Sequence, residues 1–361
     1  MRDKTIFILL TLFLFNCSNN EPEPSLDMDE GRKFKMGFST WVFGPTEQDR
    51  NETYSFIQSN GDIYSEQVDD RIPWNSWIND LELPIDFVQS IDDRVNMIDK
   101  NLSLVLSISP LNTSRNDLKE DWDGLPIEYN SINELKIEDA YFKHVEYLVG
   151  RFNPKYLVSA MEPNDLLINS TAKWADFKLL ASNVRSRLKT RFPSLLISES
   201  ITLHNYFQPQ VDNPSDYIQE VSDYSEEFDF IAISFYPFFK NLQTIEEYQE
   251  AFDFLHNQFN KPIAFVETSH LSGDLVIPNL NTNITGSLTR QKEYLETLVS
   301  NAHTNNYEFI IWWAHRDYDA LWETFPDEVK DIGQVWRDTG LLDEDGVERP
   351  AFSVWTNEFQ N

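Results

Sequence analysis

Cysteine and basic residues are scarce in this sequence. It contains one cysteine in 361 residues, so no disulfide can form within the chain, and a chain of this length does not need one to hold a core together. Lys and Arg number 29 against 60 Asp and Glu, which gives a net charge of −31. Nucleic acids and anionic membrane surfaces are bound through clustered Lys and Arg. The composition therefore argues against both as partners and favours a neutral or cationic ligand.

Several motifs of enzyme chemistry are also missing. The chain has no His-x-His and no clustered His/Asp spacing, which argues against a metallohydrolase. Its 11 glycines form no glycine-rich phosphate loop, and there is no Gly-x-Ser-x-Gly elbow of a serine hydrolase. We therefore expect neither a metal nor a cofactor.

The N-terminus resembles a targeting signal. The apolar run "TIFILLTLFLF" at residues 5–15 is too short to span a bilayer and has the length of a signal-peptide core. It ends in "LFNC", which resembles the lipobox of bacterial lipoproteins, with Cys17 as the lipidated residue. Residues 1–16 are then a signal peptide and residues 17–33 a lipidated, flexible tether. We expect an extracytoplasmic lipoprotein of the outer membrane or cell surface of a bacterium; the alternative is an ordinary signal peptide with an incidental cysteine.

From Phe34 onward, short apolar runs alternate with segments of helical period. This order indicates a parallel sheet whose strands are joined by crossover helices. The runs that we expect to be strands are residues 34–41, 61–67, 102–109, 156–162, 194–203, 228–236, 262–268 and 309–315. Eight strands are what a (β/α)8 barrel, or TIM barrel, requires. The predicted fold class is α/β, with a single barrel over residues 34–361.

The segments between these runs carry helix signals. Residues 170–192 open on Ser170 as a candidate N-cap and end in Lys and Arg before a proline. Residues 244–259 and 287–303 have the same character, and residues 349–359 can supply the eighth helix. No internal repeat or second domain is visible, and we expect a monomer.

Two carboxylates stand at the ends of predicted strands. Glu162 ends the fourth strand and Glu267 the seventh, each after an apolar run. A charged group there costs desolvation free energy unless it has partners or a task, and the carboxyl ends of barrel strands hold the active site. Two carboxylates about 5 Å apart can break a glycosidic bond with retention, one as proton donor and one as nucleophile. The chemistry needs the pKa of the donor raised and the nucleophile kept ionised.

Other strand ends offer candidate contacts to a substrate. Tyr236 ends the sixth strand, where its hydroxyl can reach a carboxylate on the seventh. Aromatic faces suit sugar rings, so Trp312 or Trp313 on the eighth strand is a candidate platform. The remaining candidates lie at the ends of the first, second, fifth and eighth strands: Trp41, Glu66, His204 and His315.

Four short motifs resemble a known clan of enzymes. The acid within "MEPN" on strand four, the strand "DFIAISFYPF", the motif "FVET" on strand seven and the pair "WW" on strand eight are similar to glycoside hydrolase clan A, the retaining (β/α)8 glycosidases. "DFIAISFYPF" in particular looks like the sixth strand of family 53 endo-galactanases and their relatives. The resemblance covers roughly residues 34–358 in architecture.

The resemblance implies roles for individual residues. Glu162 would be the acid/base, Glu267 the nucleophile and Tyr236 the hydrogen-bond partner of the nucleophile. The clan usually has Asn directly before the acid/base, where it holds the substrate 2-hydroxyl, whereas this chain has Met161. Asn164, from the loop beyond Glu162, is the candidate substitute.

Two functional hypotheses follow. The first is a surface-anchored retaining endo-glycosidase that hydrolyses a β-linked polysaccharide or oligosaccharide. The second is a catalytically inactive barrel that binds glycan for an uptake system, which Met161 and the lipid anchor favour. We expect the long segments 42–60, 110–135 and 270–288 to set the choice of sugar and linkage, because loops at strand ends carry specificity.

Overall fold

The computed structural model describes residues 31–305 and 307–361. One compact unit spans Arg32–Asn361. The predicted signal peptide, Cys17 and nearly all of the tether lie outside the described residues. Within the part that the structure describes, no helix has the length and apolar character needed to cross a membrane.

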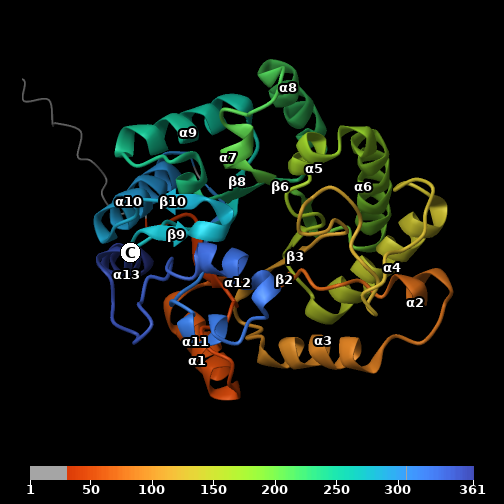
Figure 1. The fold of residues 1–361 in the computed structure, drawn as a ribbon, viewed down its shortest axis with the longest axis horizontal. Coiled ribbons are helices and arrows are strands. Elements are labelled where there is room, and N and C mark those ends of the chain that lie inside the picture. Colours follow the sequence, from red (N-terminus) through yellow and green to blue (C-terminus); the bar gives the residue numbers. More distant parts are fainter. Residues whose placement is uncertain (1–30, 306) are drawn as a thin grey trace, which may run out of the picture. The chain divides into compact units, whose positions relative to one another are not determined.

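The main sheet is a closed barrel of parallel strands (Figure 1). Its strands are β1 (Lys35–Ser39), β2 (Ile63–Val68), β3 (Ser103–Ile108), β4 (Tyr156–Val158), β5 (Leu196–Ser198), β6 (Ser200–Thr202), β7 (Ile231–Phe235), β8 (Ile263–Thr268) and β11 (Phe309–Trp312). Their order is β5-β4-β3-β2-β1-β11-β8-β7-β6, so β5 and β6 are the two edges. Only Glu199 separates these two strands along the chain, so both edges belong to one segment and the sheet closes on itself. Eight segments form the barrel, and the predicted (β/α)8 fold is confirmed.

A helix follows each barrel segment. The outer helices are α1 (Glu47–Asn60), α3 (Ile85–Met97), α4 (Leu135–Phe152), α6 (Thr171–Arg191), α8 (Pro214–Ser225), α9 (Ile245–Gln258), α10 (Leu288–Asn305) and α13 (Pro350–Phe359). The connections hold α2 (Trp74–Ile78), α5 (Asn164–Asn169), α7 (Leu203–Tyr206), α11 (Asp319–Trp322), α12 (Asp327–Gly333), the 3-10 turns η1 (Pro237–Lys240), η2 (Pro278–Leu280) and η3 (Gln334–Trp336), and the antiparallel hairpin of β9 (Leu275–Ile277) and β10 (Thr282–Ile284). The predicted helices over 170–192, 244–259, 287–303 and 349–359 correspond to α6, α9, α10 and α13.

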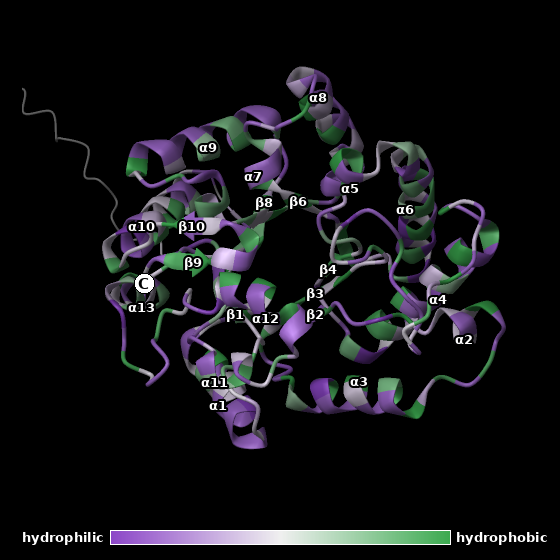
Figure 2. Cartoon of the chain, in the orientation of Figure 1, coloured by the Kyte–Doolittle hydropathy of each residue, from purple (hydrophilic) through white to green (hydrophobic). Residues whose placement is uncertain are grey.

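Side chains alternate along each strand between two parts of the core, as the pleat of a strand requires. The residues inside the barrel form one cluster that includes Ile63, Val105, Ala264 and Ile311 but no residue of the outer helices. Their neighbours along the strands pack outward into a larger cluster with the helices. Figure 2 accordingly shows helices that carry both polar and apolar residues. This alternation decides which strand residues face the mouth of the barrel.

The capping signals in the sequence differ in how well they match the observed helix ends. Helix α9 begins with a capping box, in which Thr244 caps the amide of Glu247 and the Glu247 carboxylate accepts from the Thr244 amide. Ser170 occupies the N-cap position of α6 as predicted, but its side chain makes no capping hydrogen bond. Helix α6 instead ends with Lys189 and Arg191, whose charges suit a helix C-terminus.

Candidate active site

Glu162 lies where β4 turns into α5. Its backbone has φ of +55°, in the left-handed region that costs a residue with a Cβ roughly 1–2 kcal/mol. The turn is held because the Glu162 amide donates to Ser200 Oγ at 3.0 Å. A strained backbone at a strand end is common at functional sites. The turn directs the Glu162 carboxylate into the mouth of the barrel, where Ser234 and Arg115 donate hydrogen bonds to it at 2.7 and 3.1 Å.

Glu267 reaches the same mouth through a β-bulge. Strand β7 pairs Ile233 with Phe265 and the next residue, Ser234, with Glu267, so Val266 is an extra residue on β8. Simple alternation would point Glu267 toward the helices, because Phe265 packs there. The extra residue reverses this direction, which is a known use of bulges near active sites. Glu267 then accepts hydrogen bonds from the Tyr236 hydroxyl and from Gln67 Nε2, the latter at 2.6 Å.

Ser234 connects the two acids. It is the register partner of Glu267 on the adjacent strand, and its hydroxyl donates to Glu162 Oε1 at 2.7 Å. Neighbouring strands lie about 4.8 Å apart, so the two carboxylates face one space at the ends of β4 and β8. The structure thus brings together the two acids that the sequence singled out.

The two acids interact electrostatically. Burial, followed by the negative charge of Glu162, raises the pKa of Glu267 to about 7, although the hydrogen bonds from Tyr236 and Gln67 act in the opposite direction. Asp165 has the same two causes, burial and then the charge of Glu162, and its pKa is also raised to about 7. Burial and the charge of Glu162 therefore move the titration of both carboxyl groups toward neutral pH, the range in which acid/base chemistry operates.

Aromatic side chains surround the pair. Trp41 and Trp313 pack together with ring centroids 5.2 Å apart, and Trp336 lies edge-on to Tyr236 at 5.8 Å. The indole nitrogens of these three tryptophans are buried and have no hydrogen-bond partner among the described residues. Aromatic ring faces at the mouth suit the apolar face of a sugar ring.

A cavity of about 600 Å³ adjoins the acid pair. Gln67, which donates to Glu267, lines it together with Trp41 and Phe325. Arg94 and Asp70 on its wall form an ion pair at 2.9 Å. The cavity has the size of a small-molecule site.

Three predicted contacts lie away from this space. Trp312 is completely buried among core residues, and its indole N–H donates to the Thr339 carbonyl at 3.0 Å. Asn164 is also buried: its side-chain oxygen accepts from the Thr202 amide at 2.9 Å, and its side-chain nitrogen donates to the Tyr217 hydroxyl at 2.8 Å. It cannot serve as the substitute for an Asn before Glu162. His315 is enclosed by phenylalanine rings, and burial lowers its pKa to about 3.

Of the remaining predicted substrate contacts, one is already occupied by other side chains and one lies at the mouth of the barrel. Glu66 lies at the wall of the cavity but is 1% exposed, and its carboxylate is already occupied because it accepts a hydrogen bond from Tyr54 on α1 and lies 3.8 Å from Arg94. His204 does lie at the mouth, with its ring 6.4 Å from that of Tyr236. Burial lowers the pKa of His204 to about 3, which keeps the ring neutral. Met161, before Glu162, packs inside the barrel with the inner cluster.

The sequence reasoning missed Ser234 and Arg115 as contacts of the acid pair, whereas Gln67 stands beside Glu66 among the polar residues at the end of the second strand. Alternation along β2 identifies Gln67, because Ile63 points inside the barrel and Gln67 shares its face, whereas Glu66 does not. No local pattern marks Arg115, which comes from the long segment between β3 and α4.

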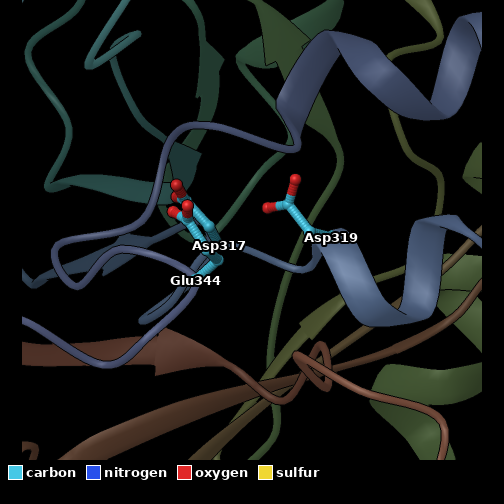
Figure 3. Close-up of side chains that lie close together, drawn as sticks. All are labelled: Asp317, Asp319 and Glu344. Atoms are coloured by element: carbon cyan, nitrogen blue, oxygen red, sulfur yellow. The ribbon is translucent and has the colours of Figure 1, made fainter.

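A second group of acids lies beyond β11. Asp317, Asp319 and Glu344 each offer an oxygen within 4.8 Å of the others (Figure 3). Arg349 donates to both carboxylate oxygens of Asp317, and the Gly340 amide adds a hydrogen bond at 2.9 Å. Asp319 lies 3.3 Å from Arg337. These two arginines already compensate the charge that a cation would balance, so we regard the group as an ion-paired cluster that holds the last loop.

The part of the chain that carries both acids matches a family model. Residues 161–354, more than half of the chain, match the model of glycosyl hydrolase family 53. The chain belongs to glycosyl hydrolase family 53. The match includes both acids, Tyr236 and Trp313. Family 53 membership agrees with the resemblance to clan A glycosidases and indicates an enzyme that hydrolyses O-glycosyl bonds.

Solved structures agree with this family 53 fold. The Ignisphaera aggregans GH53 catalytic domain has a TM-score of 0.57 and 15% identity, over 90% of this chain and 95% of that one. A GH5_18 protein from Bifidobacterium longum subsp. infantis has a TM-score of 0.63 and 13% identity, over 91% and 79%. A β-glucuronidase of an uncultured Clostridium sp. has a TM-score of 0.55 and 11% identity, and the chain spans only 50% of its length. No curated protein matches the sequence. At these identities the structures show a shared barrel.

Proposed function

We propose that this family 53 protein is a retaining glycosidase that cleaves internal bonds of a β-linked polysaccharide, with Glu162 as acid/base and Glu267 as nucleophile. The observation that carries the proposal is the carboxylate pair at the ends of β4 and β8. Ser234, the register partner of Glu267, donates to Glu162, and Tyr236 and Gln67 donate to Glu267. The two hydrogen bonds to Glu267 favour the ionised form of its carboxylate, which a nucleophile requires.

In the first step Glu267 attacks the anomeric carbon while Glu162 gives its proton to the leaving glycosidic oxygen. The C–O bond to the leaving sugar breaks, and a glycosyl ester of Glu267 forms. In the second step ionised Glu162 takes a proton from water, whose oxygen attacks the anomeric carbon and releases Glu267. Two inversions give net retention.

The surroundings support a glycan as substrate. Trp313 and Trp41 pack together and offer aromatic rings beside the acids. The cavity beside Gln67 offers room for sugar units beyond the one that is cleaved, which supports internal cleavage. The net charge of −31 agrees with a neutral polysaccharide.

The test replaces the two acids and follows hydrolysis of a panel of β-linked polysaccharides. We expect Glu267→Gln to lower kcat by at least about 10³-fold, because the nucleophile is lost. Azide added to Glu267→Ala should give a glycosyl azide of inverted configuration, whereas azide added to Glu162→Ala should give the retained one. Proton NMR of the first product of the wild type should show the anomer of the substrate linkage.

Glu308→Gln is the matched control, since Glu308 lies at the opposite end of the barrel, just before β11, and should leave kcat unchanged. Wild-type rates in Glu267→Gln, or release of the inverted anomer, would contradict the mechanism. Binding of polysaccharide without turnover by the wild type would favour the inactive glycan-binding barrel instead.

A further inference from the structure

Arg115 occupies an unusual position in the loop between β3 and α4. It has φ of +47°, a left-handed conformation that is costly for arginine. Asn112 holds the turn: its carbonyl accepts from the Arg115 amide at 3.0 Å, and its side chain exchanges hydrogen bonds with Asn116 at 2.8 and 3.1 Å. Such strain persists only where the surrounding contacts impose it.

The side chain of Arg115 is buried against the acid pair. It is 7% exposed and donates from Nη1 to the Asn112 carbonyl at 2.8 Å and from Nη2 to Glu162 Oε2 at 3.1 Å. Its Nε is buried without a hydrogen-bond partner among the described residues. Burying a guanidinium is costly unless it is paired, so its pairing with Glu162 is the main compensation for this position.

The charges around Glu162 come from several elements. Glu267 on β8 and Asp165 on α5 are acidic neighbours, and Tyr236 follows β7. Asp69, after β2, forms an ion pair with Lys119 and also attracts Arg115. Among these groups Arg115 is the cation in direct contact with Glu162. When Glu162 gives up its proton, negative charge appears on the carboxylate that Arg115 touches.

Building on the proposed function, we propose that Arg115 is a positioning residue for the acid step. Its guanidinium holds the Glu162 carboxyl in place and stabilises the charge that develops there as the proton passes to the leaving oxygen. A donor fixed where charge develops lowers the barrier because it needs no reorganisation during the reaction. Ser234 holds the other oxygen of Glu162, so the two donors fix both ends of the carboxylate.

The test uses the dependence of kcat/KM on the leaving group. Phenyl and 2,4-dinitrophenyl β-galactobiosides and β-mannobiosides are compared, because the dinitrophenolate leaves without a proton. We expect Arg115→Gln to lower kcat/KM about 10- to 100-fold for the phenyl substrates and less than about 3-fold for the dinitrophenyl substrates. Arg115→Lys should recover most of the loss. A structural defect would lower both substrate types alike.

Two further variants separate the possible failures. Glu162→Ala defines the full acid effect and should show the same selective loss, only larger. Lys173→Gln removes a cation that pairs with Asp117 on the same loop at 2.7 Å, and it should change neither substrate type. If Arg115→Gln fails to fold, Arg115→Met and Arg115→Lys provide the same comparison.

The outcomes differ clearly. Suppose that Glu162→Ala shows the selective loss of kcat/KM but Arg115→Gln loses equally with both leaving groups, or loses nothing. This result overturns the role of Arg115 and leaves the proposed function intact. A Glu162→Ala variant without selectivity contradicts the proposed function and the role of Arg115 with it.

Discussion

Tyr236 donates its hydroxyl to Glu267, and this single contact has a consequence for the pH dependence of the enzyme. The proposed nucleophile, Glu267, must be ionised to attack, and its pKa is raised to about 7, first by burial and second by the charge of Glu162. The hydrogen bond from Tyr236 favours the ionised form and so lowers this pKa. Activity should therefore fall as the pH drops below about 7.

Tyr236→Phe removes that donor. The pKa of Glu267 should rise further, so the acid limb of kcat/KM should move to higher pH, by about one unit, with a loss of activity at neutral pH. The measurement is kcat/KM from pH 5 to 9 on one polysaccharide. Tyr206→Phe is the control, because that hydroxyl contacts Ser222 on α8. An unchanged acid limb in Tyr236→Phe would show that the contact does not control ionisation of Glu267.

Helix α9 packs outside the strands that carry Ser234 and Glu267. It follows β7 and precedes β8 along the chain, so its stability helps to keep these strands in register. Its first turn is closed by the capping box of Thr244 and Glu247. Without the Thr244 hydroxyl, the amide of Glu247 loses its intrachain partner.

We expect Thr244→Ala to lower the free energy of unfolding by about 1 kcal/mol, as measured by urea denaturation. Thr244→Ser keeps the hydroxyl and should remain within about 0.3 kcal/mol of the wild type. Equal losses in both variants would assign the effect to the lost methyl group and not to the cap. The carboxylate pair should remain functional in both, because the change lies on the outer layer.

The protein as a whole combines the barrel with an N-terminal segment outside the described residues. We propose that Cys17 carries a lipid and holds the enzyme at a membrane, as "LFNC" indicates. The anchor would come from the buried acyl chains, at about 0.8 kcal/mol per CH₂ group. The strongly acidic barrel is not expected to bind an anionic membrane surface by itself.

Cys17→Ser should therefore abolish labelling with an alkyne fatty acid in a bacterial host and move the protein from the membrane to the soluble fraction. The change touches no described residue, so the hydrolysis rate of the purified barrel should stay the same. Asn16→Gly, which places a small residue before the cysteine, is the control and should keep the label. Membrane retention of Cys17→Ser would contradict the anchor.

Much of the barrel could be predicted from local patterns. Eight apolar runs are visible without tertiary information, and each became one segment of the barrel because a buried parallel strand needs a continuous apolar run. The same logic located Glu162, Glu267 and Tyr236, since polar residues at the ends of such runs meet at one mouth. The choice between Trp312 and Trp313 also lay within reach, because the alternation from Phe309 and Ile311 points Trp313 to the mouth.

The sequence by itself determined the parallel barrel and the two acids at its mouth, because apolar periodicity and strand ends are local properties. Only the tertiary structure decided how these acids are held. The extra residue Val266 reverses the direction of Glu267, and it is recognised only against the register of β7. Arg115 pairs with Glu162, which lies 47 positions later in the chain. The side chain of Asn164 is hydrogen-bonded to Thr202 and Tyr217. The strand register, the Arg115–Glu162 ion pair and the hydrogen bonds of Asn164 all join segments that are distant in the sequence. They therefore depend on tertiary packing, which no local pattern encodes.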